Sequence, residues 1–342
     1  MPPRKRAETT VTALDATLAD IEALYPGTMM MASDPDLQVV RRETGVLPLD
    51  LLLEGGLPRG RIIEVYGSYS TLKSYYAYKA IAAAQKRGEK VALIDYERSF
   101  DPEWGVELGI DLTKLPISRP KTAEQGIGTM DSLIVQKYDL IVWDSIAAAQ
   151  PKQYREAAPG EDDAPAALAR VLSRGIPRLL ANNKHTTCIF INQTRALIGQ
   201  TAFGPKSTTS GGKAMGYYAS LRMSFTRVGM ITKEIKRWDG STMVGAKLVV
   251  GHRIQCTLEK SKVSKPYSTC HFVFDLMTGS VDDVGYLIGV GIESGMIKRT
   301  KTGHYTMPGI HDKSIHGATA FREWLIDHPD IQDLLMKEAM SA

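Results

Sequence analysis

Gly67-Ser68-Tyr69-Ser70-Thr71-Leu72-Lys73-Ser74 is the stretch that decides the fold. It follows the run Arg61–Tyr66, which predicts a strand, and it opens the segment Lys73–Lys86, which predicts a helix. A phosphate-binding loop needs that context, because backbone N–H groups and the helix N-terminus hold the phosphate oxygens. We therefore expect residues 67–74 and Tyr75 to bind ATP. The Lys73 ammonium would neutralise phosphate charge, and the Ser74 hydroxyl would coordinate Mg²⁺.

Leu72 is the unusual residue of this loop, because the position before the lysine ordinarily holds glycine. Glycine allows the backbone to approach a phosphate closely, and a residue with a Cβ should tolerate that approach less easily. Taken alone, the motif is compatible with a working nucleotide loop and with a degraded one.

Three further polar side chains stand where predicted strands end. Asp144 ends one apolar run, Glu97 lies just past another, and Gln193 ends a third. Asp144 would help to hold Mg²⁺, Glu97 would polarise the attacking water as a general base, and Gln193 would sense the γ-phosphate. Each could instead be an ordinary capping or surface residue. Together with the loop they favour a nucleotide site, because open α/β sheets bind ligands at the carboxyl ends of their strands.

Apolar runs alternate with helical segments between about Gly45 and Val281. Parallel strands buried on both faces have this pattern, so we expect an α/β fold with a mostly parallel sheet covered by helices. Two polar segments, roughly Gln153–Pro165 and Thr194–Gly212, interrupt the pattern and predict functional or disordered loops. The predicted strands are Arg61–Tyr66, Lys90–Asp95, Leu140–Asp144 and Thr187–Asn192.

The two ends of the chain have a different pattern. An amphipathic helix is predicted from about Thr10 to Tyr25, and its apolar stripe could pack on its own core or on a neighbouring subunit. After about Val284 the pattern predicts a small α+β domain. Its predicted helices are Leu287–Met296, Gly317–Leu325 and Ile331–Met340, with a hairpin around Gly303. We therefore divide the chain into an N-terminal tail and helix (1–35), a nucleotide-binding core (36–283) and a small C-terminal domain (284–342).

The composition indicates a globular protein, since 43% hydrophobic residues can form a sizeable core. The net charge of +4 does not by itself indicate a nucleic-acid partner. No apolar stretch approaches the roughly 20 residues that cross a bilayer, and the polar start lacks a signal-peptide core. We expect a cytoplasmic protein without membrane contact. Cys188, Cys256 and Cys270 are too few and too scattered for a disulfide framework or a zinc site, and Cys188 is expected to be a buried thiol.

The chain resembles the RecA family over nearly its whole length. Gly55–Gly67 resembles the family's run into its P-loop. Ile94–Glu97, followed by Asp101-Pro102, resembles the segment with the catalytic glutamate and the adenine contacts. Phe190–Arg195 resembles the strand that carries the γ-phosphate-sensing glutamine into the second DNA-binding loop, and Gly211–Ala214 resembles the return from that loop.

The resemblance implies an ATP-dependent strand-exchange recombinase that forms helical filaments on single-stranded DNA and pairs it with homologous double-stranded DNA. ATP and Mg²⁺ are the implied cofactors, with Asp101 and Trp104 beside the adenine. Lys260 and Lys262 fall where the family places two lysines that reach the neighbouring subunit's ATP, where they would stabilise charge on the transferring phosphoryl group. The implied DNA contacts are Arg170, Arg174, Arg195, Ile198, Phe203, Ser210, Gly211 and Gly212.

This chain departs from the family pattern at three places. A bulky residue at position 72 is similar to phage recombinases of the UvsX type and favours a phage-encoded member. Gly216 replaces an interface lysine, and the acidic first loop, Glu156–Pro165, would repel phosphate. Two alternatives remain open. Leu72 would suit a non-catalytic filament regulator or mediator, and the fold would suit a hexameric helicase or ATPase clock, although the second-loop motif argues against the latter.

Overall fold

The computed structural model describes residues 16–156, 166–196, 207–238 and 243–341. The chain divides into two units, Met1–Val40 and Arg41–Ala342. In the first unit residues 16–24 are helical, within the span expected for the N-terminal helix, and Pro35–Leu37 forms the 3₁₀ turn η1. The second unit contains the sheet and the candidate site residues that the structure describes.

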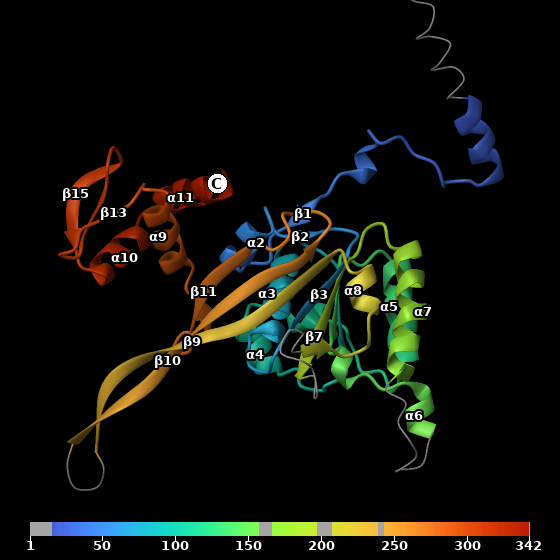
Figure 1. The fold of residues 1–342 in the computed structure, drawn as a ribbon, viewed down its shortest axis with the longest axis horizontal. Helices are drawn as coiled ribbons and strands as arrows, with labels where there is room; N and C mark the ends of the chain where they lie inside the picture. Colours follow the sequence, from blue (N-terminus) through green and yellow to red (C-terminus); the bar gives the residue numbers. More distant parts are fainter. Residues whose placement is uncertain (1–15, 157–165, 197–206, 239–242, 342) are drawn as a thin grey trace, which may run out of the picture. The chain divides into compact units, whose positions relative to one another are not determined.

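A ten-stranded sheet forms the centre of the second unit (Figure 1). Its strands are β3 (Ile62–Gly67), β4 (Val91–Asp95), β5 (Ile117–Ser118), β6 (Leu140–Asp144), β7 (Thr187–Ala196), β8 (Ser207–Thr209), β9 (Leu221–Trp238), β10 (Met243–Ser261), β11 (Thr269–Asp275) and β12 (Ser280–Val281). They lie in the order β12-β11-β10-β9-β3-β7-β6-β4-β5, and β8 pairs with β7. The pairs from β9 through β3, β7, β6 and β4 to β5 are parallel. The expected α/β fold is confirmed.

Helices cover both faces of the parallel strands, which is why β3, β4 and β6 are buried along their whole length. One core cluster joins Ile63 and Val65 of β3 to Tyr76 of the first large helix. The other joins the opposite face of the sheet to Ile127 and Leu172 of two further helices. The helices of this unit before residue 220 are α2 (Leu47–Leu52), α3 (Lys73–Lys86), α4 (Pro102–Glu107), α5 (Ala123–Val135), α6 (Lys152–Glu156), α7 (Ala166–Asn182) and α8 (Ala214–Tyr218).

The long antiparallel hairpin β9–β10 was not predicted from the sequence. β9 and β10 pair along their whole length, from Leu221 opposite Ser261 to Trp238 opposite Met243 (Figure 1). The pairing of β9 with β3, in contrast, ends at Phe225. β11 pairs with β10 as far as Gly251, which lies opposite Ile231 of β9, and beyond those residues the hairpin is a two-stranded arm whose described residues are mostly exposed. The apolar residues of the arm, such as Leu248 and Val249, are exposed, so the long buried apolar runs that identified the other strands are missing here.

The C-terminal residues form a separate three-stranded sheet. Its strands β13 (Lys298–Arg299), β14 (His304–Met307) and β15 (His311–His316) are antiparallel, and they share a core with α9 (Asp283–Glu293), α10 (Ala318–Ile326) and α11 (Pro329–Ser341). Helix α9 begins four residues before the predicted start, because Asp282 caps it by accepting a 2.8 Å hydrogen bond from Gly285 N. Among the described helices, none combines the length and the apolar character needed to cross a bilayer.

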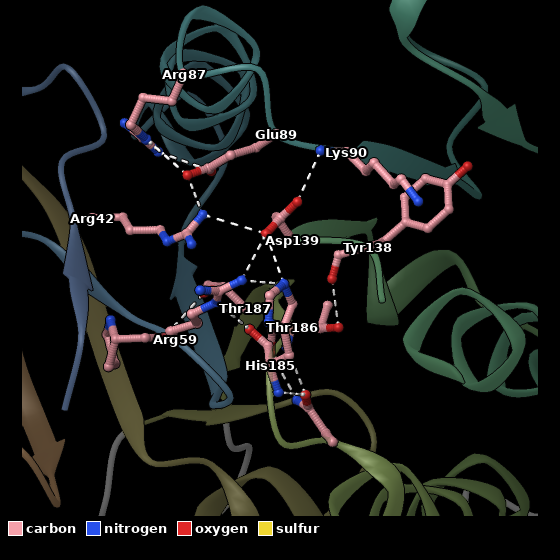
Figure 2. A network of polar contacts seen from close by, with 12 residues as sticks. Arg42, Arg59, Arg87, Glu89, Lys90, Tyr138, Asp139, His185, Thr186 and Thr187 are labelled. Carbon is pink, nitrogen blue, oxygen red and sulfur yellow. Dashed lines mark hydrogen bonds and ion pairs between the residues drawn. The ribbon is translucent and has the colours of Figure 1, made fainter. Parts of the chain in front are cut away.

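A polar network joins the amino ends of β4, β6 and β7 (Figure 2). Asp139, just before β6, accepts hydrogen bonds from His185 Nε2 at 2.7 Å and Arg59 Nη2 at 3.0 Å. Its other oxygen accepts from Lys90 N at 3.0 Å, and Arg42 Nη1 lies 3.5 Å from the first. This carboxylate therefore ties together segments that meet at the edge of the sheet opposite the carboxyl ends of these strands.

Candidate nucleotide and DNA site

The parallel register brings the predicted nucleotide residues to one edge of the sheet. Gly67 of β3 is level with Gln193 of β7, and Asp95 of β4 is level with Asp144 of β6. Since these four strands are neighbours, their carboxyl ends meet, and the segments that leave them lie side by side. Four separate sequence segments thereby contribute to a single site.

Lys73 is held inside the loop that precedes α3. Its Nζ donates to Ser68 O at 2.5 Å and to Thr71 Oγ1 at 3.4 Å, and the residue is 8% exposed. Burial lowers the pKa of Lys73, while the nearby carboxylates Asp144 and Glu97 oppose that shift. The ammonium thus lies at the centre of the loop, as a phosphate-neutralising group must.

Ser74 and Asp144 form the pair expected to hold magnesium. Ser74 Oγ donates to Asp144 Oδ2 at 2.9 Å, and Asp144 is 2% exposed. Burial, with help from Glu97 and Asp95, raises the pKa of Asp144 to about 7. One hydroxyl and one carboxylate are the hard oxygen ligands that Mg²⁺ prefers, and this ion usually takes its remaining ligands from phosphates and water.

Glu97 lies between two donors. Gln193 Nε2 donates to Glu97 Oε1 at 3.0 Å, and the Ser145 hydroxyl donates to the same oxygen. The sequence analysis did not identify Ser145 as a site residue. The signal was present, because Ser145 directly follows the strand that ends in Asp144, just as Glu97 lies just past a predicted strand. These contacts orient one carboxylate oxygen, so that the other can accept a proton from water.

Leu72 has a left-handed backbone conformation, with φ of +69°. It is the N-cap of α3, and its partly buried side chain packs against the first core cluster. The glycine usual at this position therefore has a physical reason in this chain as well, because side chains disfavour positive φ. The loop keeps the conformation in spite of the leucine.

The predicted adenine contacts lie at the start of α4. Asp101 caps this helix by accepting from Glu103 N at 2.9 Å, and the Trp104 ring meets Tyr78 edge-on with ring centres 5.4 Å apart. Both Asp101 and Trp104 thus belong to one short element, and the tryptophan is anchored on α3, the helix of the phosphate loop.

The remaining loop positions differ in exposure. Ser68, Tyr69 and Ser70 are exposed, with Tyr69 at 83%. Tyr75 instead is buried against Phe274 and accepts a hydrogen bond from Val281 N at 3.2 Å. Any contact of Tyr75 with nucleotide would therefore be made by its main chain.

The predicted DNA residues fall into two groups. Arg170 and Arg174 are exposed on α7, one helical turn apart. Arg178, a further turn along, is paired with Asp131 at 2.8 Å. The sequence prediction did not include Arg178, and its pairing distinguishes it from the other two.

The second loop leaves the sheet through β7, which carries Arg195, and returns through β8. Ile198 and Phe203 lie outside the described residues. At the exit Ser210 O accepts from Asn192 Nδ2 at 2.9 Å.

Gly211 and Gly212 follow Ser210 with φ of +85° and +73°. A Cβ on Gly211 would lie 2.4 Å from Leu172 Cδ1, and one on Gly212 would lie 2.7 Å from Ala169 Cβ. The loop exit therefore packs directly on the helix that carries Arg170 and Arg174.

Lys260 lies near the end of β10, and Lys262 directly follows that strand. Lys260 Nζ donates to Gly216 O at 2.7 Å and to Tyr217 O at 2.9 Å, near the end of α8. Burial, then the charges of Lys262 and Arg222, lower the pKa of Lys260. The strand order places β9 between β10 and β3, the strand that leads into the phosphate loop.

Comparison with known proteins adds an independent finding. The family described as RecA N-terminal domain matches residues 12–281. Protein RecA of Kineococcus radiotolerans is 37% identical over 334 residues, which cover 95% of this chain and 90% of that protein. Protein RecA of Bordetella petrii is 37% identical over 329 residues, covering 93% and 86%. The family match ends before α9, whereas the similarity to these relatives covers nearly the whole chain.

Proposed function

This chain belongs to the RecA family of recombination and repair proteins, and from that membership we propose that it is an ATP-dependent DNA strand-exchange recombinase. It forms helical filaments on single-stranded DNA and pairs the bound strand with homologous double-stranded DNA. ATP with Mg²⁺ is its cofactor, and its ATPase activity depends on DNA.

The observation that carries the proposal is the 3.0 Å contact between Gln193 and Glu97. Glu97 would take a proton from the attacking water, and Gln193 would bind both this carboxylate and the γ-phosphate. Because β7 continues from Gln193 to Arg195 and into the second loop, a change at the phosphate is passed directly to the DNA-binding segment. Magnesium on Ser74 and Asp144 would neutralise phosphate charge when bound.

Lys260 and Lys262 complete the site of the neighbouring subunit. Burial, and then the charges of Lys262 and Arg222, lower the pKa of Lys260, and a polyanion beside these cations would stabilise them. We assign their phosphate partner to another subunit's ATP, as the resemblance to the RecA family implies. ATP at the interface then favours the filament, and hydrolysis releases it.

DNA would be held by its backbone, which leaves the bases free to test pairing. The exposed Arg170 and Arg174 supply charge, while the Gly211-Gly212 exit supplies main-chain groups near them. Contacts of this kind carry no base preference, as a homology search requires.

The experiment that tests the proposal measures ATP hydrolysis and strand exchange side by side, with and without single-stranded DNA. We expect DNA-stimulated hydrolysis together with joint-molecule formation, and Lys73→Ala should lose both. A non-catalytic regulator, the alternative that Leu72 favours, would show neither activity yet bind existing filaments. Hydrolysis coupled to duplex unwinding, without strand exchange, would instead indicate a helicase.

A further inference from the structure

Cys256 and Cys270, which are well separated in the sequence, lie directly opposite each other on β10 and β11. Both point into the first core cluster and are 0% and 6% exposed. Directly opposed residues of antiparallel strands have Cα atoms about 4.5–5.5 Å apart. A disulfide spans about 4.4–6.8 Å between Cα atoms, so these strands need not move to be linked.

The two thiols already interact. Burial, followed by a hydrogen bond and repulsion from Cys270, raises the pKa of Cys256 well above its ordinary value. Cys188 offers a contrast within the same chain. It lies on β7 with Ile62 and Ile141 opposite it on the two neighbouring strands, and burial alone raises its pKa to about 12.

Cys270 is the less deeply buried of the two residues, with 6% exposure against 0% for Cys256. It contributes to the wall of a 320 Å³ cavity between β11 and α9, lined by Phe272 and Gly289. It also contributes to a 780 Å³ cavity on the side of α2 and α11, lined by Leu51 and Met340. Cys256, fully buried behind it, lines neither cavity.

We propose that Cys256 and Cys270 are a redox-active thiol pair that small disulfides such as glutathione disulfide convert into a reversible intramolecular disulfide. Cys270, as thiolate, attacks one sulfur of glutathione disulfide and releases the first glutathione thiolate. Cys256 then loses its proton to that thiolate and attacks the Cys270 sulfur, which releases the second glutathione. Two protein thiols are oxidised to one disulfide, and one glutathione disulfide is reduced to two glutathiones.

The bond would join β10 to β11 across the register shown by the structure, and it would involve no residue of the nucleotide site. The proposal therefore stands independently of the recombinase function. Its readout is the chemistry of three thiols, which can be followed without measuring ATP hydrolysis.

The test uses the full-length, reduced protein incubated folded with glutathione disulfide, then denatured, alkylated and mapped by mass spectrometry. Free thiols should fall from three to one, the linked peptides should contain Cys256 and Cys270, and dithiothreitol should restore all three. Linkage through Cys188, or a folded protein that keeps all three thiols, would overturn the proposal.

Single variants test the order of attack. Cys256→Ala should accumulate one glutathione on Cys270, whereas Cys270→Ala should stay unmodified, and Cys188→Ala should form the bond like the wild type. Glutathione on Cys256 in the Cys270→Ala protein would overturn the assignment of Cys270 as the first nucleophile. If a variant fails to fold, the peptide map of the wild-type chain still decides whether the pair closes.

Discussion

The Ser74 hydroxyl donates a 2.9 Å hydrogen bond to Asp144 Oδ2 and so joins the phosphate loop to the end of β6. This carboxylate is almost fully buried, and Glu97 and Asp95 repel its charge. Without a cation the site is therefore a point of local instability, which ATP with Mg²⁺ would relieve.

Asp144→Asn should stabilise the nucleotide-free protein while abolishing ATP hydrolysis. Removing a buried charge with repulsive neighbours should raise the free energy of unfolding by about 1 kcal/mol at pH 8. Urea denaturation in the presence of EDTA measures this change. Ser74→Ala is the matched control and should shift stability in the opposite direction, because it removes the donor and keeps the charge. A less stable Asp144→Asn protein would contradict this account.

Glu97→Gln should separate ATP binding from ATP hydrolysis. Since Glu97 would act on water rather than on nucleotide, hydrolysis should slow by about 10²-fold or more while ATP-dependent filaments persist. Filaments are followed by light scattering or electron microscopy, and hydrolysis by phosphate release. If filaments vanish together with hydrolysis, Glu97 has a structural role.

Leu72→Gly and Leu72→Ala form a matched pair that tests the positive φ. Both variants lose the leucine packing, but only glycine removes the Cβ from a left-handed backbone. The glycine variant should therefore be more stable than the alanine variant by about 1 kcal/mol in chemical denaturation. The reverse order, which is usual inside helices, would show that residue 72 does not keep this conformation in solution.

Asp139→Asn should destabilise the protein by about 2 kcal/mol near neutral pH, since it weakens charge-assisted bonds to Arg59, His185 and Lys90 N (Figure 2). Partial burial alone would raise the pKa of Asp139, but the Lys90 amide, His185 and Arg42 together lower it. A lowered pKa stabilises the fold above the ordinary aspartate value and loses that effect as the pH falls.

The stability gap between wild type and Asp139→Asn should therefore narrow below about pH 4. Asp333→Asn makes the same charge change at an exposed position of α11 and should stay within about 0.5 kcal/mol of the wild type. A gap at Asp139 that does not change with pH would attribute the effect to packing rather than charge.

Lys262→Ala is the cleanest test of the interfacial site, because Lys260 also holds two carbonyl groups near the end of α8. It should leave stability within about 0.5 kcal/mol and still remove DNA-stimulated hydrolysis and ATP-stabilised filaments. Mixing it with Lys73→Ala should restore a small part of the activity, since some interfaces then pair an intact loop with an intact lysine. Normal hydrolysis by the Lys260→Ala/Lys262→Ala protein would disprove the shared site.

The parallel part of the fold could be predicted because its strands are buried on both faces. The bounds of Lys73–Lys86 and Leu140–Asp144 were predicted to the residue, since a loop motif opens the helix and continuous apolar residues form the strand. The β9–β10 arm could not be predicted in this way, because its exposed residues are under no packing constraint that leaves a pattern.

The candidate site was predictable in its residue types more than in its contacts. Lys73, Ser74, Glu97, Asp144 and Gln193 do meet at one sheet edge, although their roles remain predictions. The contacts of Ser145, Lys260 and the Cys256–Cys270 pair depend on register and side-chain direction, which no short sequence window contains.

The Gly211-Gly212 exit packs on Leu172 and Ala169, so the end of the second loop and helix α7 form one packed unit. Protein interiors are close-packed and transmit displacement rather than absorbing it. A displacement of the second loop should therefore shift α7, and with it Arg170 and Arg174, which we propose to contact DNA. If both segments bind DNA, a stretch of the bound strand would be distributed over the second loop and α7 instead of being concentrated at one of these two contacts.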